Sequence, residues 1–268
     1  MVAFWQLLRE LKMAERKIAL IGAGNVATHL GVSLKTANYS IIQVCSKTKS
    51  SAEELAHKLD ADVCTDIKSL SSDADIYIIS VPDDQIEIVT QNIQLENKIV
   101  VHTSGSVDLN VFSGSANNYG VFYPLQTFSK EKPVIMQEVP ICLEASNKET
   151  FQELEQIANS ISKHVYAIKS DQRAQIHIAA VFACNFTNHL YAIADLLLQE
   201  KNIPLDILGP LIKETAEKAL NNPPAAVQTG PAVRGDLKVL EKHLNSIKNV
   251  QHKEIYKLIS ESISNQES

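Results

Sequence analysis

The sequence predicts an α/β protein in which a doubly wound, mainly parallel sheet is followed by an all-α domain. Between residues 14 and 169, short apolar segments alternate with amphipathic helical segments, an order typical of parallel sheets. After residue 170 every periodic segment has helical spacing. The first apolar segment also runs directly into a glycine-rich turn that opens a helix. We therefore expect two domains, at 14–169 and 170–268.

Residues 1–13 lie outside this pattern. They have the composition of a short amphipathic helix and lack the long apolar core of a signal peptide. Met13 stands shortly before the first expected strand, where a domain of this class usually begins. We interpret residues 1–13 either as an extension or as the result of a mis-assigned start.

Strands are expected where β-branched and apolar residues cluster between turn residues. By this criterion the strands are 17–21, 40–45, 62–64, 75–81, 98–102, 120–123, 139–144 and 164–168. Helices are expected directly after the glycine turn and at 51–59, 84–93 and 149–162. The second domain has helices at 175–199, 205–220, 236–249 and 252–264. The first of these four is apolar on nearly every side, which predicts that it is buried.

The turn after the first strand has the spacing Gly22-x-Gly24-x-x-Ala27. In a dinucleotide-binding βαβ unit the first glycine permits the sharp turn, the second lets a pyrophosphate approach the backbone, and the small third residue keeps the helix near the sheet. The N–H groups at the helix N-terminus then bind the phosphates. The pattern predicts Gly22, Gly24, Asn25 and Val26 as cofactor-binding residues. A tight turn without a ligand is the alternative.

The end of the second strand predicts which nicotinamide cofactor is bound. Enzymes that use NAD carry a carboxylate there for the ribose 2′-hydroxyl, about 20 residues beyond the turn. This sequence instead has Ser46, Lys47 and Thr48, which are two hydroxyls and a cation. A 2′-phosphate fits this set, so the pattern favours NADP over NAD. In the alternative interpretation Lys47 is a solvated loop lysine.

Further candidates follow later strands, because ligands of doubly wound sheets lie beyond the carboxyl ends of the strands. Val81 and Pro82 close the fourth strand and Thr103 follows the fifth, so we expect these three residues beside the cofactor. Turn formation explains the segment 102–106, to which Thr103 belongs, equally well. The polar and aromatic segment 123–129 is either a substrate wall or a rigid loop.

The long helix carries His177, Asn185, Asn188 and His189 among apolar neighbours. Polar side chains buried in a helix need partners, and a substrate can be one. We expect His177 and Asn185 to line the active site, with His177 as the proton donor. A purely structural role for the histidine is the alternative. No carboxylate joins the histidines at ligand spacing, so no metal site is predicted.

Arg234 precedes a later helix and is the third catalytic candidate. A guanidinium at this place can hold an anionic group of a small-molecule substrate. An ion pair with Asp236 is the alternative.

The composition excludes several partners. A net charge of -6 without any run of Lys or Arg argues against nucleic-acid binding. The four cysteines show no C-x-x-C spacing and are typical of reduced thiols, so we expect a cytoplasmic protein. The apolar segment 176–198 is interrupted by Asn, His and Asp residues, which argues against a membrane span.

Several segments occur in a characteristic order: GAGNVATHL, VCSKT, ISVPD, HTSGS, FYPLQTFS, HIAAVFACNF and TGPAVRGD. Together they resemble a Rossmann-like family with a helical C-terminal domain of unknown function, similar to pyrroline-5-carboxylate reductases and more distantly to β-hydroxyacid dehydrogenases. The resemblance covers about residues 17–264. It implies NADP binding and a dimer built from the helical domains, but no particular substrate. The β-hydroxyacid dehydrogenases carry a catalytic lysine on the long helix, and no lysine lies between Ser170 and Glu200 here.

We interpret the chain as an NADP-dependent oxidoreductase that reduces a small carbonyl or imine acid in an interdomain cleft. A non-catalytic NADP-binding sensor or regulatory protein is the alternative, and the missing lysine favours it. A reductase that uses another hydride carrier, such as a deazaflavin, is a further option.

Overall fold

The structure is a computed structural model that describes residues 16–265. The chain divides into two compact units, Met1–Val181 and Phe182–Ser268, and each is described by itself. The expected domain boundary at residue 170 coincides with the start of a helix whose first turns belong to the first unit. The interpretation of residues 1–13 concerns a segment outside the described residues.

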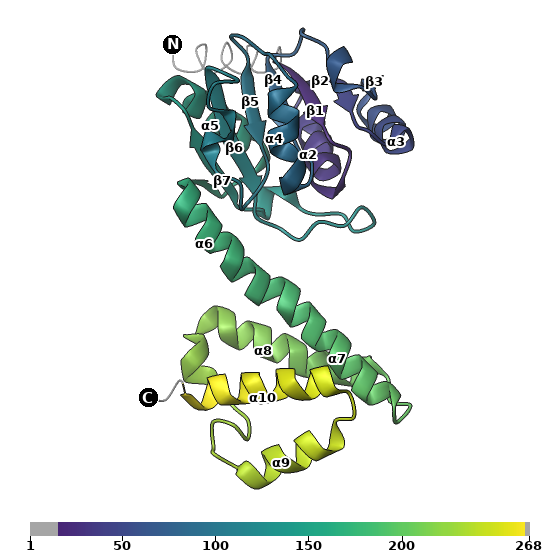
Figure 1. Cartoon of the computed structure of the whole chain (residues 1–268), viewed down its shortest axis with the longest axis vertical. Helices are drawn as coiled ribbons and strands as arrows, with labels where there is room; N and C mark the ends of the chain where they lie inside the picture. The colour runs from purple at the N-terminus through teal and green to yellow at the C-terminus, as the bar shows by residue number, and fades with distance from the viewer. Residues whose placement is uncertain (1–15, 266–268) are drawn as a thin grey trace. The chain divides into compact units, whose positions relative to one another are not determined.

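The first unit is built on an eight-stranded sheet of order β3-β2-β1-β4-β5-β6-β7-β8 (Figure 1). Its strands are β1 (Lys17–Ile21), β2 (Ser40–Cys45), β3 (Asp62–Cys64), β4 (Ile76–Ile79), β5 (Ile99–His102), β6 (Asn118–Pro124), β7 (Ile141–Ala145) and β8 (Val165–Ala167). All pairs are parallel except β6 with β7. The connection between those two strands contains no α-helix, which a parallel crossover usually needs. The predicted doubly wound, mainly parallel sheet is confirmed.

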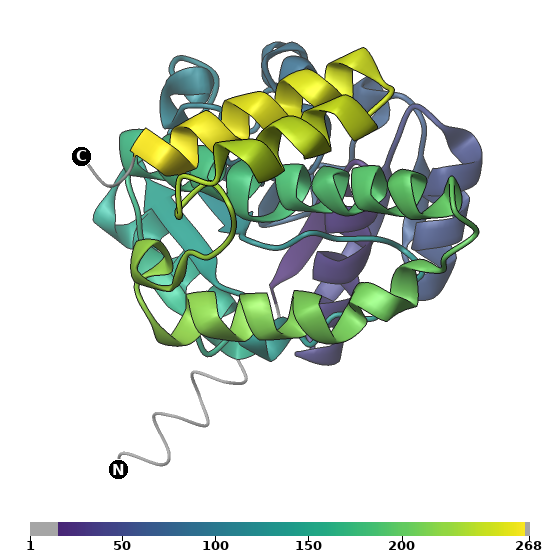
Figure 2. The ribbon, with the colours of Figure 1, turned by 90° about the horizontal axis from the view of Figure 1, so that it is seen from below.

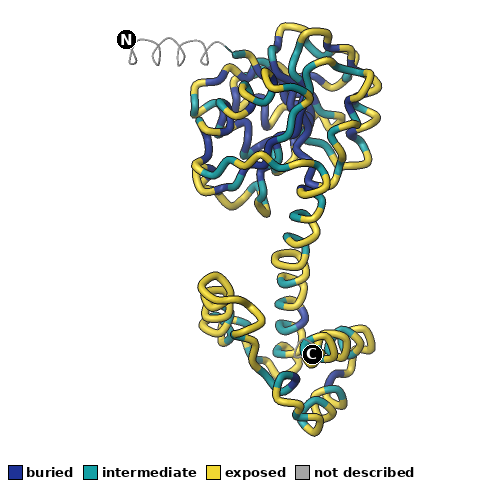
Figure 3. Tube along the Cα trace, turned by 90° about the vertical axis from the view of Figure 1, so that its left-hand side faces the viewer, coloured by how far each residue is buried: buried dark blue, intermediate teal, exposed yellow. Residues whose placement is uncertain are grey.

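Helices cover both faces of this sheet. The helices α2 (Asn25–Thr36), α3 (Lys49–Leu59) and α5 (Lys148–Ile161) contribute to one core, and α4 (Asp83–Gln91) contributes to the other. Strand β1 explains the division, because alternate residues of a strand point to opposite faces. Ile18 and Leu20 enter the first core, whereas Ala19 and Ile21 enter the second. Figure 3 shows the buried residues of the first unit as dark blue stretches in its interior.

The long helix differs from its prediction in its start, its regularity and its burial. It begins at Ser170 and consists of α6 (Ser170–Ala180), a π-helical stretch (Val181–Phe186) and α7 (Thr187–Gln199). The Thr187 hydroxyl donates to the Phe182 carbonyl, five residues earlier, at 3.1 Å, a bond that suits the wider π turns. Only Arg173 and Ile193 of the stretch are buried. Neither unit taken by itself buries the rest of this stretch, although the apolar composition predicts burial.

The second unit is helical. After α7 it contains α8 (Gly209–Asn221), α9 (Leu237–Ser246) and α10 (Val250–Ser264). Helices α9 and α10 lie side by side (Figure 2), and the Tyr256 hydroxyl is 2.8 Å from His243 Nδ1 between them. Asp236 caps α9 by accepting from the Val239 N–H at 3.2 Å. The all-α C-terminal region is thus confirmed.

Candidate active site

The glycine turn between β1 and α2 lies directly against the end of β4. Gly22 has a φ of +112°, and a Cβ built on it would lie 2.1 Å from the Ser80 carbonyl oxygen. Gly24 has a φ of -82°, which any residue adopts, and a Cβ there would meet no heavy atom within 4 Å. The fold therefore requires the first glycine, whereas the second leaves open space in front of α2.

Helix α2 begins without a side-chain cap and without an acidic residue in its first turn. The first N–H groups of a helix have no partner within it, and the helix dipole places positive partial charge at this end. An uncapped N-terminus beside open space is a suitable site for a pyrophosphate. The residues present thus fit a dinucleotide.

Asn25 uses its side chain for another contact. Its Nδ2 donates to the Phe128 carbonyl at 2.9 Å, and His29 Nε2 donates to the Ser129 carbonyl at 2.8 Å. These bonds hold the segment after β6 against the first turns of α2. Asn25 and the half-buried Val26 can each offer their backbone N–H to a phosphate.

A cavity of about 440 Å³ lies at the carboxyl ends of β1, β2 and β4. The Lys47 side chain is exposed, and its Nζ donates to Gln85 Oε1 at 3.0 Å. None of the described residues that line the cavity is Asp or Glu. Of the predicted cofactor-binding residues, those that line it are Gly22, Gly24, Ser46, Lys47, Thr48, Val81 and Pro82.

Thr103 does not line the cavity. It is buried, and its Oγ1 donates to Ser80 Oγ at 3.2 Å. The next residue, Ser104, accepts the N–H groups of Ser106 and Val107 on its Oγ, each at 3.0 Å. The alternative interpretation of the 102–106 segment, turn formation, therefore accounts for Ser104.

His102 is fully buried at the end of β5. Its Nδ1 accepts from the Ser104 N–H at 3.1 Å, and its ring stacks on Phe112 with centroids 5.6 Å apart. Burial, together with the charge of Arg173, lowers the pKa of His102 to about 3. The imidazole is thus neutral near pH 7 and is not a proton donor there.

His177 lies at the carboxyl ends of β5 and β6. Its Nδ1 is 3.2 Å from Tyr123 Oη, and it packs against Gly105. Asn185, in the π-helical stretch, and Arg234, before α9, are both exposed and belong to the second unit. Asp236 caps α9, which gives its carboxylate a role other than the ion pair with Arg234 that was the alternative interpretation. The gathering of the three catalytic candidates around one substrate stays a prediction.

Arg173 was not identified as an important residue from the sequence. It is 1% exposed, and its Nη1 donates to Glu144 Oε2 at 2.6 Å while its Nη2 donates to the Val107 carbonyl. Glu144 also accepts from the Ser170 N–H at 3.0 Å. This buried cluster joins the start of α6 to β7 and to the loop after β5. Glu144 lies 29 positions away in the sequence, so local spacing carries no signal for the pair.

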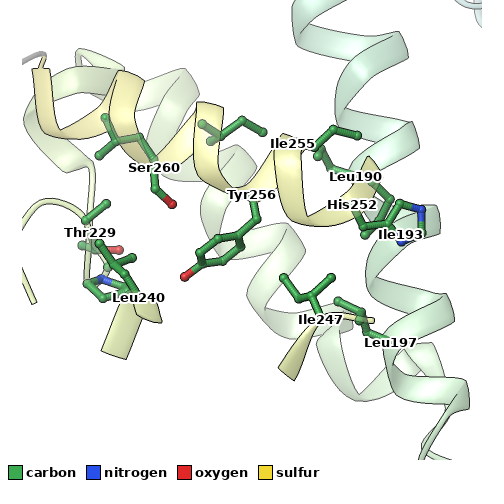
Figure 4. A pocket seen from close by; sticks show the side chains of 15 residues that line it. Leu190, Ile193, Leu197, Thr229, Leu240, Ile247, His252, Ile255, Tyr256 and Ser260 are labelled. Atoms are coloured by element: carbon green, nitrogen blue, oxygen red, sulfur yellow. The ribbon is translucent and has the colours of Figure 1, made fainter. Parts of the chain in front are cut away.

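The second unit has a cavity of its own, of about 310 Å³ (Figure 4). Apolar side chains of α7 and α10, among them Ile193 and Ile255, form a large part of its wall. Thr229 and Gly230, from the segment before α9, also line it. Arg234 does not belong to this wall.

Comparisons with known proteins agree with this geometry. Two family models match the chain, one described as NADP oxidoreductase, coenzyme F420-dependent, at residues 17–105, and one as a domain of unknown function, DUF2520, at residues 139–263. A candidate NADP oxidoreductase from Bacteroides fragilis is similar over 94% of this chain and 99% of its own, with 42% identity and a TM-score of 0.89.

Two more distant structures share the fold. A 1-pyrroline-5-carboxylate reductase from Streptococcus pyogenes is 13% identical over 93% of this chain and 98% of its own, with a TM-score of 0.61. An imine reductase from Myxococcus stipitatus in complex with NADP+ is 16% identical over 93% of this chain and 92% of its own, also with a TM-score of 0.61. No curated protein matches the chain.

Proposed function

Because the chain belongs to the family of NADP oxidoreductases that carry a C-terminal DUF2520 domain, we propose that it is a reductase that prefers NADP(H) to NAD(H). Family and fold together make it an NAD(P)-dependent oxidoreductase. One observation carries the preference for NADP: the cavity at the ends of β1, β2 and β4 has Ser46, Lys47 and Thr48 in its wall and no carboxylate among its described lining residues. When bound, the reduced nicotinamide supplies a hydride.

We propose a small carbonyl or imine acid as the substrate, held in a cleft between the two domains. Reduction of either group needs a proton as well as a hydride, and His177 at the carboxyl edge of the sheet can supply it. Asn185 is a polar partner for the substrate, and the exposed Arg234 can hold its carboxylate. Of the proteins that share the fold, one is named an imine reductase and another a 1-pyrroline-5-carboxylate reductase.

Turnover of NADPH with a panel of keto and imino acids tests this function. Oxidation of NADPH that depends on one of the acids supports a reductase. Tight NADPH binding without turnover of any compound favours the alternative, a nucleotide-binding sensor.

NADPH is expected to bind about ten to a hundred times more tightly than NADH, since a charge-assisted contact contributes roughly 1.5–3 kcal/mol. Lys47→Asp should reverse the preference by repelling the 2′-phosphate and accepting the ribose hydroxyl. Fluorescence titration measures both affinities. Lys49→Asp is the matched control, because Lys49 is an exposed neighbour whose Nζ lies 3.6 Å from Glu53 Oε1. This substitution should not change the ratio of the NADPH and NADH affinities. Equal affinities of the unaltered protein for both cofactors would contradict the assignment.

We further propose that two copies of the chain form a homodimer through their second units. Large apolar side chains are exposed along it, including Phe182, Phe186, Leu196, Leu211 and Leu220. Extended exposed apolar patches mark contact surfaces. By length and composition alone, the helix Ser170–Gln199 is also long and apolar enough to cross a membrane. Asn185 and Asp195 would be costly in a bilayer, so we favour a second copy of the chain as the partner.

Light scattering is expected to give a particle of twice the 29.6 kDa chain mass at micromolar concentration. Leu196→Asp should produce monomers, because a buried unpaired carboxylate is costly. Ile135→Asp is the control, since this side chain of the first unit is 73% exposed. A stable, folded monomer of the unaltered chain would refute the dimer, and a requirement for detergent would point to a membrane instead.

We propose the cytoplasm as the compartment. All four cysteines are free thiols, and Cys45, Cys64 and Cys142 are buried. Free thiols are typical of reducing compartments, whereas secreted domains usually pair them.

A further inference from the structure

The buried base of α6 orients His177. Arg173 precedes His177 by one helical turn, so both side chains lie on one face of the helix. The Arg173 guanidinium bonds Glu144 on β7, and Ser170 Oγ donates to the same carboxylate at 2.6 Å. These contacts fix the rotation of α6 about its axis. They therefore also fix the direction in which the His177 side chain leaves the helix.

Gly105 makes room for the imidazole. A Cβ on Gly105 would lie 2.6 Å from His177 Nδ1 and 2.8 Å from Tyr123 Cζ, closer than real Cβ atoms come to their neighbours. Gly105 is not among the glycines with positive φ. Its missing side chain therefore serves the approach of the two rings rather than the turn.

Tyr123 is the partner of His177. Its Oη lies 3.2 Å from Nδ1, and the ring planes meet at 66°. Burial raises the pKa of Tyr123 to about 12, with Cys142 and Asp83 acting in the same direction and Arg173 against them. The phenol thus stays protonated near neutral pH. Its hydroxyl can donate to Nδ1 of a neutral imidazole and can accept from Nδ1–H of an imidazolium, so the bond persists in both states.

We propose that Tyr123 is a positioning residue that directs the Nε2 proton of His177 toward the substrate, an inference that rests on the reductase function proposed above. With Nδ1 engaged by Tyr123, Nε2 makes no hydrogen bond to the described residues. The substrate carbon of C=N or C=O gains the hydride with its electron pair from the reduced nicotinamide. The nitrogen or oxygen gains the Nε2 proton of the imidazolium. His177 is left neutral with its proton on Nδ1, and solvent then reprotonates Nε2.

The first test needs no activity. The ring nitrogens of His177 are observed by NMR in the full-length apoprotein labelled with 15N-histidine, and His177→Gln assigns them among the eight histidines. Tyr123→Phe should shift the Nδ1 resonance of His177, because the hydroxyl partner is gone. Tyr119→Phe removes a hydroxyl from the same strand and should not shift it. An unchanged Nδ1 resonance in Tyr123→Phe would overturn the pairing.

The second test uses the panel compound that is turned over. Tyr123→Phe should lower kcat roughly tenfold to a hundredfold through misplacement of the imidazole, with KM and NADPH affinity unchanged. His177→Gln should lower kcat by roughly 10²–10⁴. The double variant should be no slower than His177→Gln, since Tyr123 acts through the imidazole. A clearly slower double variant would mean that Tyr123 itself gives the proton, and the proposal would be wrong.

The pH profile separates positioning from mere loss of stability. In the unaltered protein the plot of kcat against pH should have a limb that falls with rising pH, because the imidazolium is the acid. Tyr123→Phe should lower the maximal kcat but keep the decrease of kcat with rising pH. His177→Gln should abolish that decrease. A Tyr123→Phe profile without the limb would contradict the assigned roles. If no panel compound is turned over although the Nδ1 resonance responds, the reductase function fails and the pairing stands.

Discussion

Gly22→Ala is expected to destabilise the first unit by about 3 kcal/mol or more, enough to leave much of the protein unfolded. Two effects combine at this position. A φ of +112° is rarely adopted by a residue with a side chain, and the new methyl group would lie 2.1 Å from the Ser80 carbonyl oxygen. Neither β1 nor β4 can move away, because hydrogen bonds join both to further strands. Urea unfolding measures the loss.

Gly24→Ala should separate folding from cofactor binding at the same turn. Its φ of -82° suits alanine, and the methyl group would enter open space. We expect the melting temperature of the apoprotein to stay within about 2 °C of the original value. The affinity for NADPH should fall roughly tenfold or more, because the methyl group lies where the pyrophosphate approaches. Unchanged NADPH affinity in Gly24→Ala would argue against a dinucleotide at this helix.

Gly114→Ala is the control for backbone strain alone. Gly114 has a φ of +84°, but a Cβ there would meet nothing within 4 Å. Its substitution should cost about 1–2 kcal/mol. The additional loss in Gly22→Ala then measures the clash with Ser80. Equal losses of unfolding free energy in Gly22→Ala and Gly114→Ala would show that the structure relieves the close contact with Ser80 at no cost.

Arg173→Met is expected to destabilise the protein by about 3–5 kcal/mol. Methionine fills most of the space but leaves the Glu144 carboxylate, whose side chain is 17% exposed, without its cation. Glu144→Gln in the same chain should recover part of the loss, because a neutral amide is less costly to bury than an unpaired charge. Urea unfolding of both single variants and the double variant gives the coupling energy.

Lys163→Met is the matched control for this pair. Lys163 and Glu138 form an ion pair of 2.9 Å, but their side chains are 65% and 56% exposed. Solvent screens such a pair, so its loss should cost no more than about 1 kcal/mol. If Arg173→Met and Lys163→Met cost the same, the buried cluster does not anchor α6.

Local patterns in the sequence were sufficient for most of the fold. The strand Lys17–Ile21, the glycine turn and α2 follow from residues that are neighbours in the chain, since backbone conformation and the periodicity of burial are local properties. The absence of a carboxylate directly after β2 is likewise evident from the sequence alone. The same patterns predicted the helical second part, although they did not predict the π-helical stretch Val181–Phe186.

Only the tertiary structure decided which side chains meet. Tyr123 and His177 are 54 positions apart, and periodicity indicates that a residue is buried without indicating its partner. The same holds for Asn25, whose side chain bonds a carbonyl 103 positions away. Gly105 gives the simplest example. In the sequence it belongs to an ordinary turn, but in the fold two rings from β6 and α6 occupy the space where its side chain would be.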